Sequence, residues 1–119
     1  MPDSIVIYHN PRCSKSRAAL ALIHDRGVEP EVVEYLETPL DAEALRELLA
    51  TLGMSARDLV RSGEAPYREL GLAAPDTSED DLVAAIAANP ILMQRPVVRR
   101  GDRAVVGRPP ERIAELLDP

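Results

Sequence analysis

The chain has 119 residues, a typical length for one domain, and its 45% hydrophobic and 29% charged residues are those of an ordinary globular protein. It has no apolar run long enough to cross a membrane and no signal-peptide pattern, so we expect no membrane partner and a reducing cytoplasm for its single cysteine. The net charge of −6 and the absence of Trp and Phe argue against a general nucleic-acid-binding surface.

The first third of the chain predicts a strand, a helix and a second strand. Ser4–Tyr8 is short and apolar, as in a buried strand, and residues 14–26 are rich in helix formers and are followed by Gly27. Glu31–Leu36 is rich in Val and Tyr, which favour a strand. A β-α-β order of this spacing predicts that the two strands run parallel.

The middle of the chain, roughly residues 38–90, predicts only helices. We place Pro39 in the first turn of a helix that stops at Gly53, and Ser55 in a capping box that opens the next, with Arg61 at its end. A short helix over residues 64–71 and one from Ser78 to Ala88 follow.

The last third predicts a β-hairpin and a helix. Pro96–Arg99 and Ala104–Val106 are the expected strands, with a connection longer than two residues and with surface roles for Arg99, Arg100 and Arg103. We therefore expect an α/β fold of order β-α-β, helical insertion, β-β-α. In this order we expect a four-stranded mixed sheet flanked by helices, in a single domain of residues 1–119.

Cys13 lies where the first strand gives way to the first helix. The first turn of a helix has unpaired N–H groups and the positive end of the dipole, and both favour a thiolate. Arg12, Lys15 and Arg17 add positive charge without a neighbouring acid. We expect a reactive thiol with a pKa below the ordinary cysteine value, rather than a buried structural cysteine.

A second cationic segment, residues 91–112, carries six arginines and two acidic residues. Two cationic segments in an acidic protein indicate a site for a small anion. His9, His24 and Cys13 form no metal-binding motif, so we expect no metal and no bound cofactor.

The chain resembles, over nearly its whole length, the thioredoxin-like arsenate reductases coupled to glutathione and glutaredoxin, in the ArsC/Spx superfamily. The segments that carry the resemblance are Ile7-Tyr8-His9-Asn10-Pro11-Arg12-Cys13-Ser14-Lys15-Ser16-Arg17, Glu34-Tyr35-Leu36-Glu37-Thr38-Pro39, Pro66-Tyr67 with Leu70-Gly71-Leu72, Asn89-Pro90-Ile91-Leu92-Met93-Gln94-Arg95-Pro96 and Gly107-Arg108-Pro109-Pro110-Glu111.

The resemblance implies a role for each matching residue. Cys13 would be the nucleophile, three arginines would hold the oxyanion, and His9 and Ser16 would help to keep the thiol ionised. The three arginines are Arg61, Arg95 and Arg108. Pro96 would lie beside the reactive sulfur. The remaining candidates for substrate binding are Asn10, Arg12, Ser14, Lys15 and Arg17.

The expected chemistry is the two-electron reduction of arsenate to arsenite. Arginine suits a tetrahedral dianion because its planar fork holds two oxygens and stays charged. The reaction also needs a second thiol, which this chain lacks. We therefore expect glutathione as co-substrate and glutaredoxin as protein partner.

The residues after Cys13 separate three other interpretations of the motif. A Cys-x5-Arg phosphatase is excluded because position 19 is Ala19. A monothiol glutathione-dependent thiol transferase stays open, since Ser16 stands where dithiol enzymes have a second cysteine. The non-enzymatic Spx regulators, which bind RNA polymerase, also share the fold, but Ser16 excludes their Cys-x-x-Cys redox switch.

Overall fold

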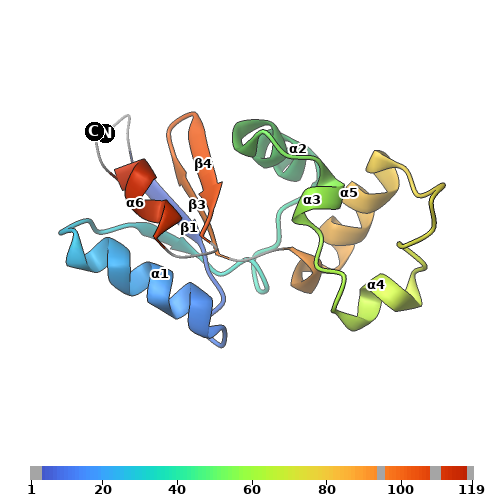
Figure 1. The fold of residues 1–119 in the computed structure, drawn as a ribbon, viewed down its shortest axis with the longest axis horizontal. Coiled ribbons are helices and arrows are strands. Elements are labelled where there is room, and N and C mark those ends of the chain that lie inside the picture. The colour runs from blue at the N-terminus through green and yellow to red at the C-terminus, as the bar shows by residue number, and fades with distance from the viewer. Residues whose placement is uncertain (1–3, 94–95, 108–110, 118–119) are drawn as a thin grey trace. The chain divides into compact units, whose positions relative to one another are not determined.

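The computed structural model describes residues 4–93, 96–107 and 111–117. By its internal contacts the chain divides into two compact units, residues 1–38 with 95–119 and residues 39–94 (Figure 1). Along the described stretches, no helix has the length and hydrophobicity that crossing a membrane requires.

The first unit is built on the mixed four-stranded sheet that the sequence predicts. Its elements are β1 (Ile5–Tyr8), α1 (Ser14–Asp25), β2 (Glu31–Val33), β3 (Val97–Arg100), β4 (Arg103–Val106) and α6 (Arg112–Leu117). The strand order is β2-β1-β3-β4. β1 runs parallel to β2 and antiparallel to β3, and β3 and β4 form the predicted hairpin.

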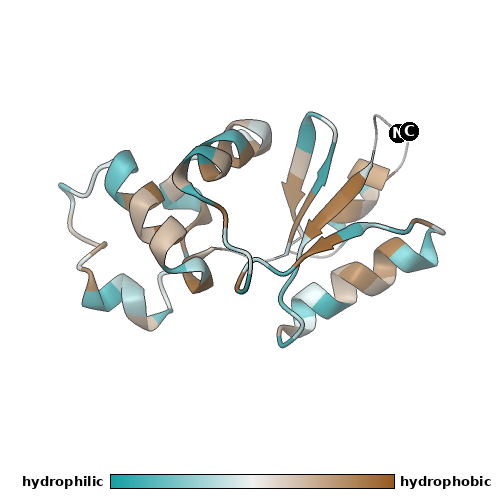
Figure 2. Ribbon diagram, turned by 180° about the vertical axis from the view of Figure 1, so that it is seen from behind, coloured by the Kyte–Doolittle hydropathy of each residue, from teal (hydrophilic) through white to brown (hydrophobic). Residues whose placement is uncertain are grey.

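One apolar cluster joins the sheet to both helices of this unit. Its buried members are Ile5 and Ile7 of β1, Val98 of β3, Ala19 and Ile23 of α1, and Ile113 and Leu116 of α6. In Figure 2, β1 is largely hydrophobic, whereas α1 is hydrophilic at both ends and hydrophobic in its middle. The start of α1 is thereby anchored beside the end of β1.

The hairpin differs from its prediction. Arg100 pairs with Arg103, so the connection is the two-residue turn Gly101-Asp102, and Gly101 has φ of 58°. A positive φ at the first turn position favours glycine. The surface role predicted for Arg100 is wrong, because its Nη1 is partly buried and donates to the carbonyls of Leu116 and Leu117 at 3.0 and 3.1 Å. Unpaired carbonyls at the end of α6 are thus satisfied.

β2 is shorter than expected, because it ends at Val33 instead of Leu36. The chain turns there: the backbone N–H groups of Glu37 and Thr38 both donate to the Glu34 carbonyl, at 3.0 and 2.9 Å. This turn places residues 34–37 at the edge of the sheet where the parallel strand β1 also ends.

In the described part of the second unit the regular elements are helices, joined by turns and by one isolated β-bridge. Its elements are α2 (Ala42–Leu52), α3 (Ala56–Leu59), α4 (Ala65–Glu69), α5 (Glu79–Ala88) and the 3₁₀ helix η1 (Pro90–Leu92). The capping box at Ser55 and the cap at Ser78 are confirmed. α2 begins later than predicted, because Asp41 caps it by accepting from the Ala44 N–H at 2.8 Å, and η1 is an element that the sequence does not predict.

Candidate active site

Cys13 lies at the N-cap position of α1, as the sequence predicts. Its backbone N–H donates to the Asn10 carbonyl at 3.0 Å, and its own carbonyl accepts the first helical bond from Arg17 at 3.0 Å. The thiol forms no disulfide and is partly exposed. The loop of residues 9–13 therefore presents one sulfur at the start of a twelve-residue helix, where N–H groups lack intrahelical partners.

Ser16 holds this loop in place. Its side chain is fully buried, and its Oγ lies 2.6 Å from His9 Nδ1 and accepts from the Asn10 N–H at 3.0 Å. Asn10 Oδ1 in turn accepts from the Arg12 N–H at 3.0 Å. Two residues expected to support the thiol, His9 and Ser16, are thus in direct contact.

The pKa of His9 is lowered from its ordinary value. Burial of the ring is the main cause and Arg17 acts in the same direction, whereas Glu34 opposes it. Burial penalises the charged imidazolium, so the neutral ring is favoured. In the neutral ring with the hydrogen on Nε2, Nδ1 can accept a hydrogen bond from the Ser16 hydroxyl.

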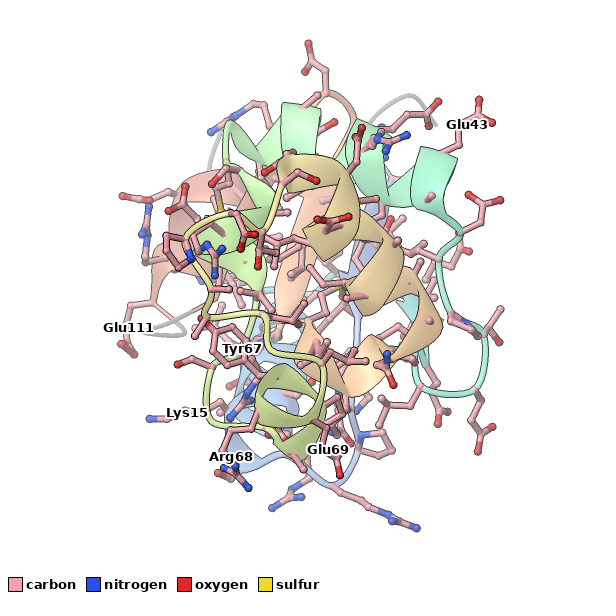
Figure 3. The ribbon with its side chains drawn as sticks, turned by 90° about the vertical axis from the view of Figure 1, so that its right-hand side faces the viewer. Lys15, Glu43, Tyr67, Arg68, Glu69 and Glu111 are labelled. Atoms are coloured by element: carbon pink, nitrogen blue, oxygen red, sulfur yellow. The ribbon has the colours of Figure 1, made fainter. Side chains whose placement is uncertain are left out.

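The polar residues around Cys13 are mostly exposed. Ser14, Lys15 and Arg12 lie at the surface near the helix start, and Figure 3 shows Lys15 extending outward. Arg17 Nη1 donates to the Pro11 carbonyl at 2.9 Å, so this guanidinium also braces the loop. From the sequence we expect Arg17 to bind substrate and to add positive charge near the thiol, and this bracing role is one that the sequence does not predict.

A pocket of about 210 Å³ adjoins the loop in the first unit. It is lined by residues of two segments, which are His9, Asn10, Pro11 and Arg12 of the loop and Glu34, Leu36 and Glu37 after β2. Our interpretation of the sequence gives residues 34–37 no role in a site. The predicted parallel pairing of the first two strands could have indicated this role, because the segments that follow parallel strands meet at one edge of the sheet.

Arg61 belongs to the second unit and follows α3. Its backbone is fixed by the Val60–Met93 bridge and by the bond from its N–H to the Leu92 carbonyl at 2.7 Å. Its Nε lies 3.5 Å from Glu64 Oε2, and the side chain is 22% exposed. A guanidinium held in this way loses little freedom on binding an anion.

The remaining predicted residues are placed only in part. Pro96 is buried in the first unit, and its carbonyl accepts from the Gly107 N–H at 2.8 Å. Arg95 and Arg108 lie outside the described residues. Within the described ranges, no three His, Cys, Asp or Glu side chains gather as a metal site would require.

Comparison with known proteins gives a consistent result. The model of the ArsC family matches residues 8–116. The Escherichia coli K12 protein named "Uncharacterized protein YfgD" is 54% identical over 118 residues, 98% of this chain and 99% of that protein. "Arsenate reductase" of Neisseria meningitidis serogroup B is 49% identical over 98% of this chain and all of its own length. The solved "Arsenate reductase from Vibrio cholerae" has a TM-score of 0.93 and 45% identity, covering 96% of this chain and 98% of that one.

Proposed function

Because this chain belongs to the ArsC family, we propose that it is an arsenate reductase with Cys13 as its nucleophile. The observation that carries the proposal is the position of this one thiol, at the start of α1 on a loop held by Ser16 and Asn10. A helix start favours both a thiolate and a bound oxyanion. The site can therefore hold the two reactants of the first step.

In the first step the Cys13 sulfur attacks arsenic, and one arsenate oxygen leaves as water after taking up protons. Both reactants are negative, so positive groups must first neutralise the substrate. We assign this role to Arg61, Arg95 and Arg108. Arginine keeps its charge at any relevant pH and can hold two oxygens at once.

His9 and Ser16 act as positioning residues in this scheme. Their contact at 2.6 Å and the bond from Asn10 to Ser16 hold the backbone that leads into Cys13. A loop that is ordered before substrate arrives needs no reorganisation during the reaction. We propose that this order keeps the helix N–H groups directed at the thiolate.

The adduct is resolved by an outside thiol, since the chain has one cysteine. Glutathione attacks the Cys13 sulfur, and the S–As electron pair stays on arsenic. Arsenic is thereby reduced from the +5 to the +3 state and leaves as arsenite. Cys13 is left in a mixed disulfide, which a glutaredoxin reduces. The scheme suits the reducing cytoplasm, where glutathione keeps thiols reduced.

The test is arsenite formation with glutathione, glutaredoxin and their recycling system. We expect turnover by the wild type and none by Cys13→Ser, because a serine hydroxyl is hardly ionised at neutral pH. Circular dichroism and the melting temperature of Cys13→Ser should match the wild type. Turnover by a folded Cys13→Ser variant would contradict the proposal.

A monothiol transferase is the second candidate, and the observation that favours it is the Cys-x-x-Ser spacing of Cys13 and Ser16. The same preparations should be assayed for exchange with a glutathione mixed disulfide. Exchange without arsenite formation would select the transferase over the reductase.

A further inference from the structure

The pocket beside the loop contains two buried polar side chains with unused hydrogen-bonding capacity. His9 and Asn10 are 6% and 5% exposed and both line the pocket. His9 uses Nδ1 toward Ser16, and Asn10 uses Oδ1 toward the Arg12 N–H. Among the described residues, His9 Nε2 and Asn10 Nδ2 have no hydrogen-bond partner. Neither atom is fully buried, so a ligand in the pocket can reach both and hydrogen-bond to them.

The charged groups that line the pocket are of both signs. Arg12 supplies a guanidinium, and Glu34 and Glu37 supply two carboxylates. In the part of the chain that the structure describes, none of the three forms an ion pair with another side chain. All are exposed, so a ligand can reach them. With two carboxylates against one guanidinium, the lining repels a bare dianion such as arsenate, and a simple cation would leave Arg12 without a partner.

We propose that this pocket binds an α-amino acid head group, ammonium and carboxylate on one carbon, of the small thiol that resolves the Cys13 adduct. The ammonium contacts Glu34 and Glu37, and the carboxylate contacts Arg12 and the Asn10 amide. A zwitterion satisfies both signs of charge within one small group. Charge-assisted hydrogen bonds of this kind are the strong ones.

Size and position agree with a head group. The volume of about 210 Å³ is below the ~300–1,000 Å³ of pockets that enclose a whole drug-sized ligand. The rest of the thiol therefore lies outside the pocket. Since Arg12 is next to Cys13 in the chain, a molecule held by its head group here can extend toward the sulfur.

The pocket wall is also ordered in advance. The Asn10–Arg12 turn, the Ser16 bonds and the Arg17–Pro11 contact fix one side, and the turn at the Glu34 carbonyl fixes the other. Pre-ordered walls lower the entropic cost of binding. The identity of the thiol rests on the proposed function, whereas binding of the head group does not require turnover.

Binding is tested with S-methylglutathione, which has the head group but no reactive thiol. NMR titration of the wild type should shift the amide signals of residues 9–13 and 34–38 in a saturable way. The double variant Glu34→Gln/Glu37→Gln should bind on the order of tenfold more weakly, because a charged partner of the ammonium is lost. Glu31→Gln, an exposed glutamate of β2 outside the pocket, is the matched control and should bind as the wild type does.

The ligand offers a complementary test. N-acetylation removes the ammonium charge, so N-acetyl-S-methylglutathione should bind the wild type as weakly as S-methylglutathione binds the double variant. Unchanged affinity in the double variant, or shifts confined to other segments, would overturn the proposal.

Kinetics separate this proposal from the proposed function. In the double variant we expect the KM for glutathione to rise about tenfold and the KM for arsenate to stay the same. With 2-mercaptoethanol, which lacks the head group, wild type and variant should turn over alike. If the wild type forms no arsenite, the reductase proposal fails while the binding result stands. If arsenite forms with an unchanged glutathione KM, the pocket proposal alone fails.

Discussion

Ser16 has one hydroxyl, yet it serves two groups of the loop that precedes it. Its oxygen accepts from the Asn10 N–H and lies 2.6 Å from His9 Nδ1. The position that would carry the second sulfur of a dithiol enzyme is thus occupied by a buried structural group. Because the chain has no second cysteine, the loop presents one thiol, and the proposed mechanism then needs an outside thiol to open the adduct.

His9 should make stability depend on pH. Its folded-state pKa is lowered, mainly by burial, so below the unfolded-state value of about 6.5 the unfolded chain binds more protons. The free energy of unfolding should then fall as pH decreases from about 6.5 through the lower folded-state pKa, and the His9 contribution should be constant above that window. Urea unfolding at a series of pH values measures this.

The comparison for that experiment is His9→Asn, which keeps a nitrogen near the Nδ1 position but does not titrate. It should lose less unfolding free energy between about pH 7 and pH 5 than the wild type. Equal slopes in wild type and His9→Asn would show that His9 does not titrate differently in the folded chain.

Arg95 and Arg108 should be needed for turnover. Arg95→Ala or Arg108→Ala removes a charge-assisted contact to the oxyanion, and we expect a loss of kcat/KM on the order of tenfold to a thousandfold for each. Arg99→Ala is the matched control, because the Arg99 side chain bonds the Gly101 carbonyl of the hairpin. Near-wild-type kinetics in both site variants would mean that the anion is held elsewhere.

At the scale of elements, one carboxylate connects two helices of the second unit. Glu79 is in the first turn of α5, and both of its oxygens accept from the Ala56 N–H of α3, at 3.1 and 2.9 Å. It therefore complements the dipoles of two helix starts. Glu79→Ala should lower the free energy of unfolding by about 1–2 kcal/mol, measured by urea unfolding.

Asp80→Ala is the control for Glu79→Ala. Each substitution removes a carboxylate from the first turn of α5, where it interacts favourably with the helix dipole. Its partner is Arg46, at 2.8 Å across the surface. An exposed ion pair contributes less than about 1 kcal/mol. If Asp80→Ala proved as destabilising as Glu79→Ala, the contact to α3 would carry no special weight.

For the whole molecule, the proposed mechanism predicts which reductants can serve a chain with one cysteine. Turnover should require glutathione, and a glutaredoxin should accelerate it. A thioredoxin system alone should serve poorly, because it reduces disulfides and this chain cannot form one by itself. Steady-state assays with each donor supplied separately measure this. Sustained arsenite production with thioredoxin and no glutathione would refute the resolving step.

Much of the fold could be predicted because its signals are local. The apolar run before Tyr8, the caps at Ser55 and Ser78 and the glycine after α1 each depend on neighbours in the sequence. One error lies in a local turn, and the other depends on a segment distant in the sequence. β2 ends early because of the turn at Glu34, and Arg100 is drawn from solvent by the end of α6.

The sequence by itself determined a mixed sheet with one cysteine at the start of its first helix, because periodicity, caps and the missing second thiol are all readable along the chain. Only the tertiary structure decided that Ser16 contacts His9, that burial lowers the pKa of His9 and that Glu34 and Glu37 line the same pocket as Arg12. The reason is physical: burial and pocket walls are made by segments brought together through the parallel pairing of β1 and β2. Neither the buried environment nor the pocket exists until that pairing has formed.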